Sequence, residues 1–209
     1  SFNYLSDPEN GLVCVSTLPG SPATIAGIGF ALSCYPVGVE RGLMTRAQAR
    51  RLTLASVRFF AAADQSGAPD GVGYKGFFYH FLDRKTGRRT WQSELSTIDT
   101  ALLVAGMLVA ASYFDGEHAG EREIRDKVQA IYARVDWRWA QNGGGAVCMG
   151  WKPETGFLPW RWTGYNEALL LYALALGAPE HFIDADAYDA WLQSYRWKNI
   201  YGYAHVYAG

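Results

Sequence analysis

The apolar positions of the chain divide its predicted helices into two classes. One class is apolar on nearly all sides and comprises residues 24–42, 96–114 and 166–176. The other class alternates with it, carries apolar residues on one face only, and comprises residues 45–62, 119–134 and 186–195. A helix that is apolar all round is buried, whereas a one-sided helix covers a core. The pattern therefore predicts an all-α fold with an inner and an outer ring of helices.

Local signals place the ends of these helices. Thr45 and Gln48 have the spacing of a capping box, in which each side chain binds the other's backbone N–H group. Pro36 is expected to kink the first inner helix. Residues 1–5 are predicted to be the end of an earlier helix, and the aromatic tail 196–209 shows no clear period.

The segments before the inner helices are irregular, and they are aromatic or rich in glycine. Short β-hairpins are predicted within them, at residues 76–91 and 147–159. Because each such segment precedes an inner helix, these loops are expected to gather at one end of the fold. This is the pattern of an α/α toroid, and loops at one end of such a scaffold carry function.

Composition excludes several classes of protein. The chain has 209 residues, a hydrophobic fraction of 49% and a net charge of -1, so one soluble domain over residues 1–209 is expected, with no nucleic-acid partner. The longest apolar run, residues 101–112, is shorter than the roughly 20 residues that span a membrane. Three cysteines and four histidines are scattered without metal-ligand spacing, so neither a disulfide framework nor a metal or other cofactor is expected.

The tryptophans are unevenly distributed. None of the eight precedes Trp91, and five fall between Trp137 and Trp162. Sugar rings stack on flat aromatic side chains, so this region favours a carbohydrate-binding surface, although aromatic core is the alternative for each residue. The candidate substrate-binding residues are Tyr79, His80, Trp137, Trp139, Trp160, Trp162, Tyr165 and Asn166.

Acidic residues stand at the entry of two inner helices. Glu94 and Asp99 flank the start of the second, and Glu167 stands at the start of the third. Asp99 has a simpler explanation, because Ser96 and Asp99 resemble a capping box and an acid there complements the helix dipole. Acids delivered by two helices to the same end, however, suit glycoside hydrolysis, in which one carboxylic acid protonates the leaving oxygen and another acts as nucleophile or base.

The roles of these acids follow from their surroundings. A helix N-terminus lowers the pKa of a carboxyl group, whereas a general acid needs a pKa that burial has raised. The general acid should therefore be the more desolvated member of the set. We expect Glu94 or Glu167 in this role, with Asp99 positioning or assisting.

Three separated motifs resemble a known family. They are Gly76-Phe-Phe-Tyr-His-Phe-Leu-Asp83, Ser93-Glu-Leu-Ser-Thr-Ile-Asp-Thr-Ala-Leu-Leu103 and Gly164-Tyr-Asn-Glu-Ala-Leu-Leu-Leu-Tyr172. In this order they resemble the glycoamylase-like domain, whose family includes endo-β-1,2-glucanases of glycoside hydrolase family 144 and the related domain of cyclic β-1,2-glucan synthases. Segments 19–26 and 35–42 are also similar to its N-terminal half.

The resemblance implies an (α/α)6 toroid, here roughly its first half, that acts on β-1,2-linked glucose. Glu94, Asp99 and Glu167 match the acids of the family's cleft. A half-toroid would expose apolar inner helices. We therefore expect the chain to be a fragment, or to be covered by a missing C-terminal half or a second copy.

Three activities remain open at this point: glucan hydrolysis, transglycosylation and glucan binding without catalysis. A periplasmic or secreted location is expected, with the cytoplasm as the alternative.

Overall fold

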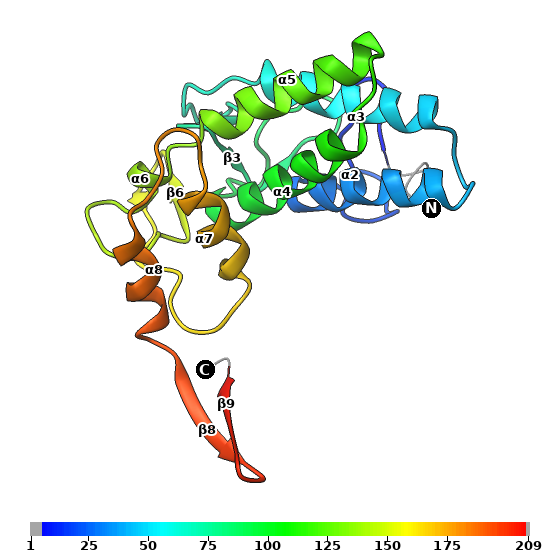
Figure 1. Ribbon diagram of the computed structural model, residues 1–209. Coiled ribbons are helices and arrows are strands. Elements are labelled where there is room, and N and C mark those ends of the chain that lie inside the picture. The colour runs from blue at the N-terminus through cyan, green and yellow to red at the C-terminus, as the bar shows by residue number, and fades with distance from the viewer. Residues whose placement is uncertain (1–5, 208–209) are drawn as a thin grey trace.

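A computed structural model describes residues 6–207 of the protein, and it is mainly helical (Figure 1). All six predicted helices are present, and their observed bounds are α2 Ile25–Glu40, α3 Arg46–Ala61, α4 Thr97–Tyr113, α5 Ala119–Ala133, α7 Ala168–Leu176 and α8 Ala185–Leu192. The single-turn helix α6, Trp137–Ala140, has no counterpart among the predicted helices. The helix end predicted at residues 1–5 lies outside the described residues. None of the described helices is long and apolar enough to cross a membrane.

The helices form two layers. The apolar helices α2 and α4 pack against each other, and the amphipathic helices α3 and α5 cover one side of that pair (Figure 1). Helix α7, also apolar, packs against α4. The two classes of helix seen in the sequence therefore occupy different layers. The Thr45–Gln48 capping box is present at the start of α3, and Pro36 lies inside α2.

Two glycines allow α2 and α4 to touch backbone to backbone. A Cβ atom on Gly106 would lie 2.0 Å from the carbonyl oxygen of Gly29, and one on Gly29 would lie 2.3 Å from the carbonyl oxygen of Leu102. Both distances are far below van der Waals contact. The closeness of the two central helices therefore depends on the absence of side chains at these positions.

The fold class needs one correction, because the short strands are not separate hairpins. They form a five-stranded antiparallel sheet in the order β2-β3-β5-β6-β7, whose strands are β2 Gly73–Tyr74, β3 Phe77–Tyr79, β5 Leu95–Ser96, β6 Gly150–Lys152 and β7 Gly156–Phe157. The predicted hairpin around β6 and β7 is part of this sheet. Strand β5 pairs with β3 on one side and with β6 on the other, and it leads directly into α4. A two-residue strand with distant partners leaves no periodic signal in the sequence.

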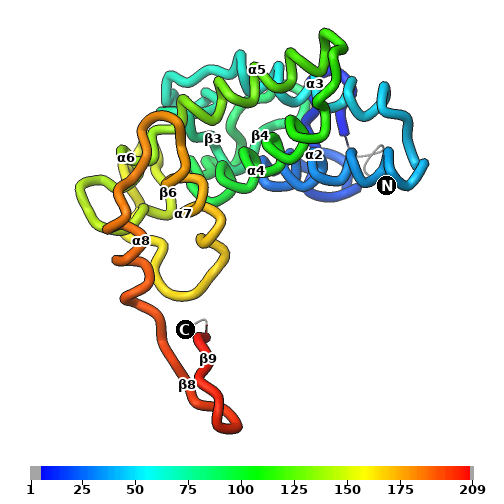
Figure 2. The backbone as a smooth tube through the Cα atoms, in the orientation of Figure 1, coloured from blue at the N-terminus to red at the C-terminus, as the bar shows by residue number. Residues whose placement is uncertain are grey.

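Two antiparallel ribbons complete the fold. Strand β1 (Ala23–Thr24) pairs with β4 (Phe81–Leu82), close to the start of α2. The C-terminal tail, for which the sequence showed no period, forms an exposed hairpin of β8 (Arg196–Ile200) and β9 (Tyr203–Tyr207). Figure 2 shows this hairpin projecting away from the helices. Because most of its residues are exposed on both faces, the alternation that marks a half-buried strand is missing.

A buried carboxylate joins the outer helices to the end of α4. Glu121, in the first turn of α5, is 3% exposed and pairs with Arg46 of α3 at 2.7 Å. Its carboxylate also accepts the Gly116 N–H group at 3.0 Å. The hydrogen bond from Arg46 lowers the pKa of Glu121 to about 2, against the opposing effect of burial.

Glu121→Gln is expected to lower the free energy of unfolding at pH 7 by about 2 kcal/mol, less than a fully buried pair gives because Arg46 is 38% exposed. A carboxylate whose pKa is lower in the folded than in the unfolded protein stabilises the folded state at pH values above its unfolded-state pKa. This contribution is lost as the pH falls through the folded-state pKa. Denaturant unfolding should therefore show the two proteins converging as pH drops from 4.5 towards 2. Glu123→Gln, which removes a more exposed pair with Arg58, is the control and should shift stability by less than about 0.5 kcal/mol. A difference that persists unchanged at pH 2 would contradict the assignment.

Candidate active site

Sheet register brings one histidine and two acids together. His80 lies between β3 and β4, Glu94 immediately precedes β5, and Asp99 is in the first turn of α4. The backbone N–H of His80 donates to the carbonyl oxygen of Glu94 at 2.9 Å, which extends the β3–β5 pairing. The three side chains therefore converge because β3 and β5 are neighbours and β5 continues into α4.

The imidazole of His80 lies between the two carboxylates. Its Nδ1 is 2.9 Å from Oε1 of Glu94, and its Nε2 is 3.6 Å from Oδ1 of Asp99. All three side chains are partly buried: 27% exposed for His80, 29% for Glu94 and 13% for Asp99. Both ring nitrogens thus face an anionic oxygen, an arrangement that favours the protonated ring.

The electrostatics of the cluster follow from this geometry. Burial acts to lower the pKa of His80, but the hydrogen bond to Glu94 and the negative charges of Asp99 and Glu94 outweigh it and raise that pKa. The hydrogen bond from His80 lowers the pKa of Glu94 against the effect of burial. Glu94 is therefore held as a carboxylate at neutral pH.

Asp99 also has the capping contacts that its spacing predicts. Its backbone N–H donates to the Ser96 hydroxyl oxygen at 3.2 Å, and that hydroxyl group donates to Asp99 Oδ2. The other carboxylate oxygen, Oδ1, faces His80. Asp99 therefore belongs both to the helix cap and to the cluster.

The same three residues have the composition of a metal site. One ligand atom from each of His80, Glu94 and Asp99 lies within 4.8 Å of the others. A histidine that binds a metal offers a nitrogen lone pair to it, with the carboxylates on the metal as well. Here the carboxylates approach the ring nitrogens themselves, so the geometry fits hydrogen bonding to a protonated imidazole better than coordination.

Glu167 is placed differently. It is exposed and forms the N-cap of α7 without a side-chain capping bond. Among the described residues its carboxylate has no hydrogen bond or ion pair, so no contact connects it to the cluster. Asn166, a predicted substrate contact, caps the helix instead: its Oδ1 accepts the Ala168 N–H at 3.0 Å, and its Nδ2 donates to the carbonyl oxygen of Thr163.

Three predicted substrate-binding aromatics are core residues, which corrects the sequence interpretation. Tyr79 and Trp137 are fully buried, and Trp162 is 9% exposed. The Tyr79 hydroxyl donates to the carbonyl oxygen of Gly67, and the indole N–H of Trp162 donates to the Thr97 hydroxyl. All three rings are thus packed inside this chain, and hydrogen bonds hold two of them, Tyr79 and Trp162, in place.

The other predicted aromatics remain accessible to different degrees. Trp160 is 63% exposed and Tyr165 is 45% exposed. Trp139 is partly buried among aromatic rings, with Trp151 at 6.0 Å and Phe157 at 4.7 Å between ring centroids. Trp160 and Tyr165 thus keep faces that a ligand could use.

Two aromatic residues beside the cluster were not among the sequence candidates. Phe81 stacks on the His80 ring with centroids 3.9 Å apart, and Trp91 contacts Phe81 at 5.2 Å. Trp91 is 69% exposed. The position of Trp91, three residues before Glu94, could have marked it as a candidate, but the sequence does not show which way its ring points.

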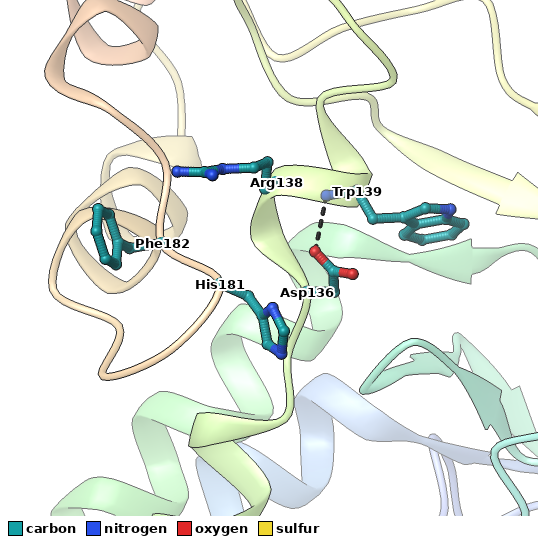
Figure 3. Close-up of a pocket in the computed structure, with 5 residues that line it drawn as sticks. All are labelled: Asp136, Arg138, Trp139, His181 and Phe182. Atoms are coloured by element: carbon teal, nitrogen blue, oxygen red, sulfur yellow. Dashed lines mark hydrogen bonds between the residues drawn. The ribbon is translucent and has the colours of Figure 1, made fainter.

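A surface pocket lies elsewhere, between α6 and the loop before α8 (Figure 3). It is lined by Asp136, Arg138, Trp139, His181 and Phe182. Its single acid, Asp136, accepts the Trp139 N–H as the cap of α6, and the Trp139 ring points away from Arg138 and Phe182. One capping carboxylate cannot supply an acid and a base, so this pocket is the weaker candidate.

Comparisons with known proteins find the same family that the three sequence motifs resemble. The Glycoamylase family model matches residues 159–209. An exo β-1,2-glucooligosaccharide sophorohydrolase from Parabacteroides distasonis is 25% identical over 90% of this chain, which covers 27% of that protein.

Solved structures extend the likeness to the fold. An endo-β-1,2-glucanase from Chitinophaga pinensis, solved with sophorotriose and glucose, has a TM-score of 0.83 at 25% identity, and the match covers 97% of this chain and 51% of that one. A β-1,2-glucanase from Parabacteroides distasonis has a TM-score of 0.78 at 24% identity, over 90% of this chain and 28% of that one, and it supports the fold alone.

The chain thus spans about a quarter of the curated relative and about half of the glucanase structure. Over that span, its sequence and its fold confirm the resemblance to the glycoamylase-like family.

Proposed function

We propose that the protein is a glycoside hydrolase that cleaves β-1,2-linked glucan by carboxylate catalysis without a metal. The observation that carries this proposal is the His80–Glu94–Asp99 cluster at the start of the buried helix α4. The sophorohydrolase and the endo-β-1,2-glucanase that resemble the chain, by their names, both act on β-1,2-linked glucose, which supports the choice of linkage.

The geometry suggests a division of roles between the acids. Glu94 is held ionised by His80, which suits a base, a nucleophile or a stabiliser of positive charge rather than a proton donor. Glu167 is then the candidate general acid from this chain. Its carboxylate is exposed here, and a general acid works from a desolvated site, which a neighbouring segment would have to supply. Asp99 positions His80.

An uncovered apolar surface supports the half-toroid arrangement. Phe30 and Val37, seven residues apart on one face of α2, are each 57% exposed. Val109 of α4 and Leu169 of α7 are 47% and 49% exposed. A further helical half of an (α/α)6 domain, or a second copy of the chain, would cover these side chains. A periplasmic or secreted location belongs to the same proposal.

The test is cleavage of defined glucans by the full-length protein. Release of reducing ends is expected from β-1,2-glucan, with little from β-1,3- or α-1,4-glucan, and excess EDTA should leave the rate unchanged. Rings or lengthened chains without new reducing ends would indicate a transglycosylase instead. Calorimetric binding without turnover would indicate a glucan-binding module, and loss of activity with EDTA would contradict the metal-free mechanism.

A further inference from the structure

An exposed tryptophan beside the cluster is held in an unfavourable backbone conformation. Trp91 has a φ of 55° and Gln92 a φ of 49°, so two successive non-glycine residues occupy the left-handed region. The Ser93 N–H donates to the carbonyl oxygen of Thr90 at 3.1 Å, which closes a turn of the type that glycine and asparagine usually form. A large aromatic side chain at such a position calls for a reason beyond the turn itself.

The surroundings hold this turn in place. The buried Arg89 donates from Nε to the carbonyl oxygen of Ser93 at 2.6 Å. Its guanidinium group pairs with both carboxylate oxygens of Glu154, at 2.7 and 3.1 Å. The Ser93 hydroxyl oxygen accepts the Phe81 N–H at 3.2 Å. The turn is therefore fixed to the loop after β6 and to β4, and its strain can persist.

The Trp91 ring contributes little to the core. It is 69% exposed, and its ring contact is with Phe81, at a centroid distance of 5.2 Å and an angle of 54°. Phe81 stacks on His80, and His80 binds Glu94. A run of rings thus leads from the acid cluster to an indole whose face is open to solvent.

We infer that Trp91 is a sugar-binding platform, on which one glucose ring of the glucan stacks while the neighbouring glycosidic bond lies at Glu94. This inference rests on the proposed function. The C–H face of a pyranose ring matches a flat indole, and burying both surfaces supplies affinity. The fixed turn presents the indole in one orientation, so little conformational freedom is lost on binding.

Trp91→Gly removes the indole ring without adding backbone strain, because glycine adopts a positive φ at no steric cost. Its effect on binding therefore reports on the ring alone. In the full-length protein this variant is expected to raise KM for β-1,2-glucan and Kd for a β-1,2-linked glucotetraose about tenfold. Its kcat should change less than about threefold, because the indole is expected to bind the substrate and the transition state equally well. The melting temperature should stay the same or rise. Trp91→Phe should restore most of the affinity. The control is Leu43→Ala, which removes another exposed apolar side chain, 80% exposed, and should keep the wild-type KM and Kd.

The outcomes distinguish this inference from the proposed function. If the wild-type protein cleaves β-1,2-glucan and Trp91→Gly keeps the wild-type KM and Kd, the platform is wrong and the function stands. A lower melting temperature in Trp91→Gly, without rescue of affinity by Trp91→Phe, would assign the ring a structural role and overturn the inference. A wild-type protein that binds none of the β-1,2-, β-1,3- and α-1,4-linked oligosaccharides would overturn both.

Discussion

Glu94→Gln is expected to lower kcat for β-1,2-glucan cleavage by about 10² to 10⁴-fold, the usual contribution of a positioned acid or base. The amide keeps the size of the side chain but cannot act as a base or nucleophile, and it removes the negative charge facing His80. KM should change far less, because the lost interaction matters mainly in the transition state. Initial rates of reducing-end release by the full-length protein measure both constants.

The controls separate chemistry from folding. Glu123→Gln changes a partly exposed acid on α5 that pairs with Arg58, and it should retain wild-type rates. Glu167→Gln should also lower kcat if Glu167 is the general acid. Cleavage at wild-type rates by both the Glu94 and the Glu167 variants would remove these residues from the chemistry.

The pH dependence provides a second test of the cluster. His80 lowers the pKa of Glu94, so the acid limb of the kcat profile should lie below the usual glutamate range. His80→Gln removes the positive partner, and this limb should then move to higher pH. The pKa of His80 is raised, so the protonated ring and its pairing are lost only as pH rises through that higher value. An acid limb at the same pH in the variant would show that Glu94 does not set it.

The helices could be predicted from the sequence because their signal is periodic and local. Helices α2 and α4 are apolar all round, and α3 carries a complete capping box, so their limits agree within a residue or two. The sheet could not be predicted, since its strands are two or three residues long and β5 pairs with distant segments. Leu95 pairs with Tyr79, 16 positions before it, and with Trp151, 56 positions after it.

The candidate site was partly predictable, because some of its residues have local signals and others depend on strand pairing. Glu94 and Asp99 could be identified from their place at a helix entry, and His80 was named only as a possible contact. That His80 lies between them is a consequence of the β3–β5 pairing. The tryptophans misled because composition does not tell which face a ring occupies: Trp137 is fully buried, whereas Trp91 is exposed.

The support beneath the cluster is the contact between α2 and α4, and Gly106→Ala is expected to disrupt it. The added Cβ would lie 2.0 Å from the Gly29 carbonyl oxygen and 2.6 Å from its Cα. Since these are backbone atoms, no side-chain rotation can relieve the clash, and the two helices must separate. We expect a loss of about 3 kcal/mol in the free energy of unfolding, at the upper end for overpacking. Denaturant unfolding of the protein measures it.

Gly38→Ala is the matched control for this substitution. Gly38 is also helical, but the nearest atoms to its added Cβ belong to the flexible Met44 side chain, with Sδ at 3.0 Å. The better helix propensity of alanine should then make the change neutral or stabilising by up to about 1 kcal/mol. Opposite signs for the same substitution in α2 and α4 would show that helix contact, not glycine content, decides stability.

Because Asp99 lies in the first turn of α4, Gly106→Ala should also reduce glucan cleavage in the folded fraction, whereas Gly38→Ala should not. Equal effects of the two substitutions would contradict a close backbone contact at Gly106.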